Sequence, residues 1–243
     1  MTYSGFHGRF NLPLTLGLGL ASGLSHRAVG SGEIGAALAV FVLVFLFAAP
    51  WDNWAVQRGI WGFDPHRTGA RIGWLPWEEY LFFLWQSFHV VATVWLLFRF
   101  FPGLRTGAET PVAPITGFLV LGVAAGTASV VHRWREKPRS PRWGYAWHLL
   151  AWFLPLISVQ WAVAPGLLFR LLPVVGGAAL FWGTYYTVVD CFAVRSGIWF
   201  FDPKQIQGSR LFGILPWEEA VFFYLTSLLV AQSFVLLLPA ACR

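Results

Sequence analysis

The chain has 243 residues, with 17 lysines and arginines against 11 aspartates and glutamates, a formal net charge of +6. Hydrophobic residues make up 57% and charged residues 12% of it, whereas soluble globular proteins have about 45–50% and about 25%. One aqueous core of this size cannot bury so much apolar side chain. The composition therefore excludes an ordinary soluble protein and predicts an integral membrane protein. Its two cysteines, Cys191 and Cys242, exclude a disulfide scaffold and a four-cysteine zinc site.

Seven segments of the chain are apolar enough to be read as bilayer crossings, which need about 20 residues each. The first is rich in glycine and contains Pro13, and the fourth ends in a basic stretch. In chain order, the predicted crossings are residues 10–24, 34–54, 75–101, 114–131, 145–163, 168–189 and 215–238.

The basic residues predict the orientation of these crossings. Twelve of the 17 lysines and arginines fall on the side of the N-terminus, and five fall on the other side. Because cytoplasmic loops carry the excess of basic residues, we expect the N-terminus and the loops after the second and sixth crossings to be cytoplasmic, with the C-terminus outside the cell (inner) membrane. The charge then reports orientation, and no nucleic-acid partner is expected.

An internal duplication is the most informative feature of the sequence. Residues 51–83 recur as residues 189–223: Asp52 corresponds to Asp190, 138 positions later, and each copy then has G-I-W-x-F-D-P. Two additional residues in the second copy move the offset to 140, at which P-W-E-E-x-x-F-F matches P-W-E-E-x-x-F-F. The sequence therefore predicts two halves of the same architecture.

The duplication and the crossings together predict an all-α polytopic membrane helix bundle. Three helices form a first repeat (residues 1–105), a linker helix and basic loop follow (106–143), and three helices form a second repeat (144–243). Four crossings separate equivalent points, so the repeats are parallel and related by a pseudo-two-fold axis along the membrane normal. Both P-W-E-E segments then lie at one depth and can face one cavity.

Eight of the 11 acidic residues lie in the two motif copies. Acids that enter a bilayer are costly, so acids that do so twice at matching positions are functional candidates. The alternative is that they are helix N-terminal acids favoured by the macrodipole after a proline. That alternative explains their position but not a doubled acid in both copies. The candidate catalytic residues are Glu78, Glu79, Glu218 and Glu219.

Adjacent residues on a helix point about 100° apart, so one glutamate of each pair can face the cavity while the other meets the loop. Partners available in the loops are Arg71 and Arg210, or Arg58 and Arg195. A carboxyl group shielded from water is favoured in its protonated form and can donate a proton. Aromatic faces can stabilise a carbocation by cation–π attraction. The aromatic residues expected to bind substrate are Trp77, Phe82, Phe83, Trp217, Phe222 and Phe223.

The doubled order G-I-W-x-F-D-P, basic loop and P-W-E-E-x-x-F-F resembles the membrane-integral lycopene cyclase family, over nearly the whole chain. The resemblance implies an isomerase (an intramolecular lyase) of carotenoid biosynthesis that cyclises the ψ ends of lycopene to β-ionone rings, giving γ- and β-carotene. It maps the family's essential acids onto Glu78, Glu79, Glu218 and Glu219. Asp64 and Asp202, where relatives often have Asn, are expected to support the site together with Arg71 and Arg210. Whether β or ε rings form and how many ends close stay open.

Lycopene from the bilayer and membrane lipid are the expected partners, and the oligomeric state stays open. No cofactor is expected, because the glycine-rich run at residues 17–23 has the wrong spacing for a dinucleotide fingerprint. No metal is expected either, because the six histidines are scattered and His89 is interpreted as a packed polar residue.

Two other classes share a plan of seven crossings. A parallel-repeat small-solute transporter needs polar residues near the bilayer midplane, whereas this chain concentrates charge at the cytoplasmic ends. A retinal-binding photoreceptor needs an intramembrane lysine for its Schiff base, and Lys137 and Lys204 are both in predicted loops.

Overall fold

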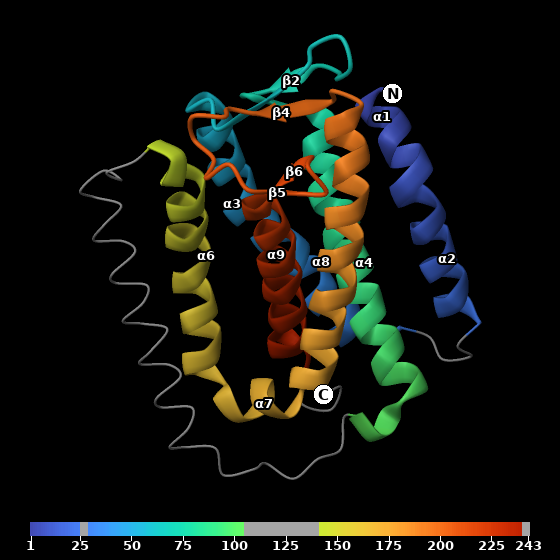
Figure 1. The fold of residues 1–243 in the computed structure, drawn as a ribbon. Helices are drawn as coiled ribbons and strands as arrows, with labels where there is room; N and C mark the ends of the chain where they lie inside the picture. The colour runs from blue at the N-terminus through green and yellow to red at the C-terminus, as the bar shows by residue number, and fades with distance from the viewer. Residues whose placement is uncertain (25–28, 105–140, 240–243) are drawn as a thin grey trace.

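The computed structural model describes residues 1–24, 29–104 and 141–239. These residues form a bundle of helices that run side by side, with short strands gathered at one end (Figure 1). Five helices in the described ranges are long and apolar enough to cross a membrane, as in a mainly helical membrane protein. They are α3 (Ser31–Gln57), α4 (Trp77–Phe100), α6 (Gly144–Val163), α8 (Leu172–Arg195) and α9 (Trp217–Leu237).

The other two predicted crossings have different outcomes. At the first, α1 (Tyr3–Phe6), a π-helical turn (His7–Asn11) and α2 (Leu12–Gly23) follow one another, but α2 has only 12 residues and is not among the five long helices. The fourth, residues 114–131, lies outside the described residues. A short helix, α7 (Pro165–Arg170), precedes α8, so the sixth crossing begins later than expected. Single 3-10 turns flank the undescribed segment at Pro102–Leu104 and Pro141–Trp143.

The packing of the helices is matched between the two halves of the chain. Helices α4 and α9 contact each other and also contact both α3 and α8. Helix α2 packs on α4, just as α6 packs on α9. Each of these helix contacts made by the first half of the chain therefore has a counterpart in the second half. Helices α4 and α9 lie between the other helices (Figure 1).

The motif loops contain short strands that the all-helical prediction did not include. Strands β1 (Trp61–Phe63) and β4 (Trp199–Phe201) pair antiparallel with each other. Within the first loop β2 (Arg71–Ile72) pairs with β3 (Leu75–Pro76), and within the second β5 (Arg210–Leu211) pairs with β6 (Leu215–Pro216). These ladders give the loop backbone hydrogen-bond partners where no helix provides them.

A glycine ends the helix before each motif loop. Gly59 and Gly197 have φ of +69° and +66°, the left-handed conformation that glycine adopts without a Cβ penalty. The N–H groups of Gly59 and Ile60 bond to the carbonyls of Val56 and Ala55, and Gly197 and Ile198 repeat this pattern. This is the Schellman arrangement, in which the residue after the glycine is apolar. It turns the chain from the end of α3 into β1, and from the end of α8 into β4.

The pairing of β1 with β4 is symmetric about one residue pair. Gly62 lies opposite Phe200, and these are sequence counterparts at the offset of 138. Outside the ladder, the N–H of Asp64 bonds to Ile198 O and the N–H of Asp202 bonds to Ile60 O, both at 3.0 Å. A Cβ on Gly62 would stand 2.8 Å from the Phe200 ring, which is 57% exposed, so a larger residue at position 62 would displace this ring. The two motif copies therefore meet at one end of the bundle.

This meeting predicts that the tips of both loops are reached from the same face of the membrane. His66 and Lys204 are exposed counterparts on the two tips. On a Cys191→Ser, Cys242→Ser background, His66→Cys and Lys204→Cys should both react with an impermeant thiol reagent from one face, measured on intact and inverted vesicles. Leu104→Cys, beyond the opposite end of α4, is the control and should react only from the other face. Labelling of the two tips from opposite faces would contradict the shared end.

Candidate active site

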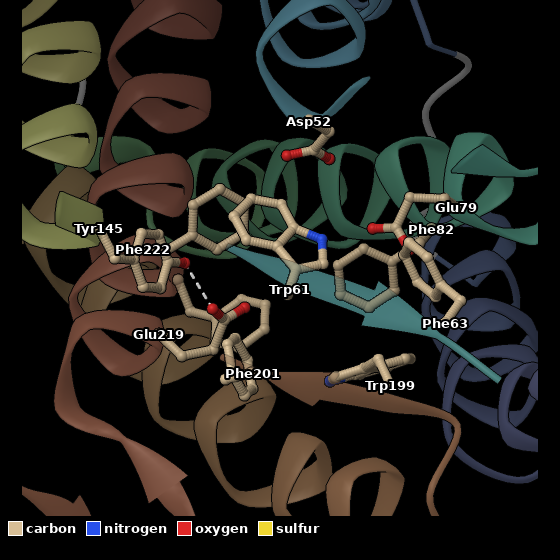
Figure 2. Close-up of a pocket in the computed structure, with 11 residues that line it drawn as sticks. Asp52, Trp61, Phe63, Glu79, Phe82, Tyr145, Trp199, Phe201, Glu219 and Phe222 are labelled. Carbon is tan, nitrogen blue, oxygen red and sulfur yellow. Dashed lines mark hydrogen bonds between the residues drawn. The ribbon is translucent and has the colours of Figure 1, made fainter. Parts of the chain in front are cut away.

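A cavity of about 390 Å³, including the part open to solvent, lies beneath the β1–β4 pair, where both motif copies contribute side chains. Figure 2 shows Asp52, Glu79 and Glu219 around the same space, with the Trp61 ring between the two glutamates in this view. The cavity is acidic and aromatic. Its lining residues are Asp52, Trp61, Phe63, Glu79, Phe82, Tyr145, Trp199, Phe201, Glu219, Phe222 and Phe223.

Glu79 and Glu219 are the motif glutamates that reach this cavity, and each accepts a hydrogen bond from a buried tyrosine. The Tyr3 hydroxyl donates to Glu79 Oε2 at 2.7 Å, and the Tyr145 hydroxyl donates to Glu219 Oε2 at 2.5 Å. The backbone positions both tyrosines in the same way: Tyr3 N donates to Arg67 O, and Tyr145 N donates to the counterpart, Gln205 O. Each carboxyl group is thus oriented in the cavity by a neutral donor.

Glu78 and Glu218 point elsewhere, because neighbouring residues on a helix are rotated by about 100°. Gly69 N donates to both oxygens of Glu78 at 3.0 Å, and the Ser4 hydroxyl also donates to Oε1 at 3.0 Å. Gln207 N, the counterpart of Gly69 N, donates to Glu218 Oε1 at 2.7 Å. Both side chains are almost fully buried, with 2% and 0% exposed. They fasten the motif loop to the first turn of α4 and of α9 and do not line the cavity.

The expected arginine partners do not contact these glutamates. Arg71 donates to the carbonyl of Phe63 and Arg210 donates to the carbonyl of Ile214. Within the described ranges, no arginine forms an ion pair with Glu78 or Glu218. The backbone N–H groups of the loops take that place, because a carboxylate can accept them with no cost of burying a second charge. Arg71 and Arg210 support the loops instead.

Asp64 and Asp202 lie in the loops, outside the cavity. Asp64 Oδ1 accepts from His66 N and Asp202 Oδ1 accepts from Lys204 N, both at 2.9 Å. The Lys204 N–H and the Gln205 side-chain amide hold the pKa of Asp202 below its ordinary value, because they stabilise the ionised form. Asp64 also pairs with Arg67 at 3.3 Å. Both aspartates therefore shape the turns that precede the P-W-E-E segments.

Of the six aromatic residues expected to bind substrate, Phe82, Phe222 and Phe223 line the cavity. Phe83 lines a neighbouring cavity. Trp77 and Trp217 line neither cavity, and their binding of substrate stays a prediction. They are the first residues of α4 and α9: the Trp77 side chain is 41% exposed and covers Gly69, and Trp217 is partly buried and packs edge-on against Trp143.

The sequence prediction missed several residues that line or support the cavity. Asp52 is 2% exposed, and its Oδ1 has no hydrogen-bond partner among the residues described. Trp61 and Trp199 are counterparts from the duplicated G-I-W. For these three the duplication itself was the signal, since each is identical in the two copies. Tyr3 and Tyr145 lie outside the duplicated segments, so no sequence signal marked them.

The structure offers no evident metal site in the chain that it describes. Among residues 1–24, 29–104 and 141–239, no group of three or more His, Cys, Asp or Glu side chains is arranged to hold an ion. His89 is fully buried and packed, with Nδ1 2.7 Å from the Tyr186 hydroxyl and Nε2 2.8 Å from the Thr15 hydroxyl.

The model of the family described as lycopene cyclase matches residues 12–104 and 141–237. The chain belongs to the lycopene cyclase family. The matched ranges contain all the residues that line the acidic cavity. Tyr3 lies before the matched ranges, so in this member of the lycopene cyclase family the Tyr3–Glu79 pair is only partly covered by the match.

The curated relatives agree with this family. The protein named lycopene beta-cyclase of Halobacterium salinarum is 28% identical over 222 residues, 89% of each chain. The bifunctional lycopene cyclase/phytoene synthase of Neurospora crassa is 29% identical over 195 residues, covering 78% of this chain and 32% of that protein. Its namesake in Phycomyces blakesleeanus is 28% identical over 193 residues, with 75% and 31% covered. No solved structure matches this chain.

The contacts of Glu78 predict a structural effect of its loss. Glu78→Gln replaces one acceptor oxygen by an NH₂ group that faces the Gly69 N–H, so we expect the free energy of unfolding to fall by about 1–3 kcal/mol. The measurement is the melting temperature of the purified protein in detergent. Glu79→Gln is the control, because a glutamine there still accepts from Tyr3. Equal melting temperatures for Glu78→Gln and wild type would contradict the fastening role.

Proposed function

We propose that this chain is a lycopene cyclase that closes the ψ end groups of lycopene to β-ionone rings in one cavity shared by its two motif copies. Glu79 and Glu219 are the proton-transferring pair. The observation that carries the proposal is that these two acids, one from each copy, line one aromatic cavity. Membership of the lycopene cyclase family and the printed names of the relatives support the substrate.

The proposed reaction moves protons and forms one carbon–carbon bond. One carboxyl group of the pair gives its proton to the terminal double bond of the ψ end, which leaves a tertiary carbocation. The π electrons of a double bond further along the chain attack that cation and close the six-membered ring, which moves the charge onto a ring carbon. A carboxylate of the pair then takes a ring proton, and the electrons of that C–H bond form the ring double bond. Atoms and electrons balance, so the product is an isomer of the substrate.

The walls of the cavity suit a cationic intermediate. Trp61, Trp199 and Phe82 present aromatic faces, which attract a cation by several tenths of a kcal/mol to about 2 kcal/mol each when they are shielded from water. Tyr3 and Tyr145 hold the acids in place from buried positions. Positioned acids of this kind contribute about 10²–10⁴-fold to a rate. The same enclosure limits the water that would otherwise quench the cation.

We also propose the finer architecture on which the shared cavity depends. Residues 1–105 and 144–243 form two parallel three-helix repeats, joined by a linker helix and basic loop at 106–143, in a bundle of seven crossings. Support comes from the matched helix pairs and from the symmetric register centred on Gly62 and Phe200. The distribution of basic residues supports motif loops and an N-terminus that are cytoplasmic, with the C-terminus outside the cell membrane. No observation favours the alternative of a small-solute transporter.

The pair of acids predicts the effect of neutral substitutions. Glu79→Gln and Glu219→Gln should each lower ring formation by about 10²-fold or more, because glutamine is nearly isosteric but transfers no carboxyl proton. The measurement is pigment composition, by chromatography, in cells that accumulate lycopene, with membrane levels of each variant checked by immunoblot. Glu33→Gln is the control, since Glu33 lies at the other end of α3, where it accepts from Gly30 N. Normal cyclisation by both variants would refute the assignment.

A proton-initiated reaction also predicts incorporation of solvent hydrogen. When cyclisation runs in D₂O, the carboxyl groups exchange and each new ring should carry one deuterium at the carbon that was protonated. Mass spectrometry of the isolated carotenoid gives the mass increase per ring. Rings formed in D₂O without any mass increase would exclude initiation by an exchangeable acid.

A further inference from the structure

A second cavity adjoins the acidic one, and Phe222 lines both. It occupies about 570 Å³, including its open mouth, between α3, α4, α6 and α9, and we refer to it as the slot. Its walls are mainly aliphatic and aromatic. The residues that line the slot are Val40, Leu43, Val44, Phe47, Ala48, Phe83, Gln86, Ser87, Phe153, Leu156, Phe222, Thr226, Leu229, Val230 and Ser233.

The polar side chains of the slot are directed to partners within the bundle. Gln86 Nε2 donates to the Thr226 hydroxyl at 2.6 Å, and Thr226 in turn donates to Phe222 O. Ser87 donates to Phe83 O, and the Ser233 hydroxyl accepts from Gln160 Nε2 at 2.8 Å. Side chains that are already paired in this way do not require a polar ligand. The slot therefore suits a long apolar molecule.

The slot reaches the lateral surface of α3, in the part of the chain that the structure describes. Leu43 lines the slot and is 48% exposed, so it lies at the mouth. Val42 and Leu46 beside it are also exposed. In a helix that is apolar and long enough to cross a membrane, this surface faces hydrocarbon. An apolar molecule can therefore pass from lipid into the slot without entering water.

The corresponding position on the other side of the bundle is filled. Val44 and Ala48 of α3 have Trp182 and Tyr186 as counterparts in α8, at the offset of 138. Both of these large side chains are buried, with 2% and 0% exposed. Tyr186 contacts Phe82 and Phe223, whose counterparts Phe222 and Phe83 line the slot.

Hydrogen bonds and ring contacts keep that filling in place. Trp182 stacks on His89 with ring centroids 4.7 Å apart and donates to the Thr93 hydroxyl at 2.9 Å. Tyr186 lies within hydrogen-bond distance of His89, 2.7 Å from Nδ1. His89 stands where the second copy has Leu229, a residue of the slot. The pseudo-symmetry of the bundle is thus broken: one side is open and its counterpart is closed.

We propose that the slot binds the polyene chain of the substrate while the ψ end group occupies the acidic cavity, so that lycopene enters from the α3–α6 side only and presents one end at a time. This inference rests on the proposed function. A linear polyene whose end group fills the acidic cavity must leave it along an apolar path, and the slot is the neighbouring apolar space that shares the Phe222 side chain as a wall with the cavity. Among the residues described, Trp182 and Tyr186 occupy the corresponding place on the other side.

The repeat supplies the substitution that tests this proposal. Val44→Trp transfers to the slot the residue that closes its counterpart, and Val42→Trp places the same side chain on the exposed surface of the same helix. In cells that accumulate lycopene, Val44→Trp should lower ring formation by about tenfold or more relative to Val42→Trp. Leu43→Trp at the half-exposed mouth, where the added ring requires little repacking of the core, should also lower it. Gel filtration and melting temperature show whether each variant folds.

A binding measurement separates the slot from the chemistry. The Glu79→Gln variant, loaded with lycopene in detergent and purified, should retain the absorption of the bound polyene. The double variant Glu79→Gln, Val44→Trp should lose about nine-tenths of that absorption, whereas the control Glu79→Gln, Val42→Trp should keep it. Retention of polyene by the folded Val44→Trp protein, together with undiminished ring formation, would overturn the slot and leave the proposed function standing. If Val44→Trp removes bound polyene but the wild-type protein forms no rings, the slot is supported and the proposed cyclase function is refuted.

Discussion

The antiparallel pairing of β1 with β4 is the interaction on which the rest of the site depends. Two strands of three residues each are a small ladder, but they join loops that are 138 positions apart in the chain. Their symmetric register brings the first turns of α4 and α9 to the same end of the bundle, which places Glu79 and Glu219 on one cavity. Gly62 leaves room for the exposed Phe200 ring, which lies over it in this pairing. Without this pairing each motif copy would hold a single glutamate with no partner.

The doubled glutamates divide two tasks that one acid could not perform. Glu78 and Glu218 accept backbone N–H groups and fix the loops, and such charge-assisted bonds are about twice as strong as neutral ones. Glu79 and Glu219 are one position further along the helix, which turns them by about 100° into the cavity. The loop-fixing acids thereby hold the first turn of each helix rigid. In the proposed reaction, a rigid first turn would position the neighbouring acid for proton transfer, which depends on distances within hydrogen-bond reach.

Duplication gives the bundle an approximate two-fold symmetry, and differences between the two copies make its two sides unlike. The ladder, the glycine turns and the tyrosine–glutamate pairs occur in both halves. Helices α3 and α8 differ where they face α4 and α9: small side chains leave a slot on one side, and Trp182 and Tyr186 fill the other. A symmetric site for one end group can thus sit beside an asymmetric path for the chain attached to it.

The sequence by itself determined the membrane class, five of the crossings, the duplication and the set of acids, because composition, apolar run length and repeated motifs are local properties of the chain. It also indicated that the glutamates of each pair diverge, which follows from helix geometry alone. It could not assign which glutamate faces the cavity, since that depends on how α4 and α9 are rotated by their packing. It placed Trp77 and Trp217 in the site, and in the structure these first residues of α4 and α9 line neither the acidic cavity nor the slot. Tyr3, Tyr145 and the pairing of β1 with β4 were decided only by the tertiary structure, because contacts between residues 74–140 positions apart leave no trace in local pattern.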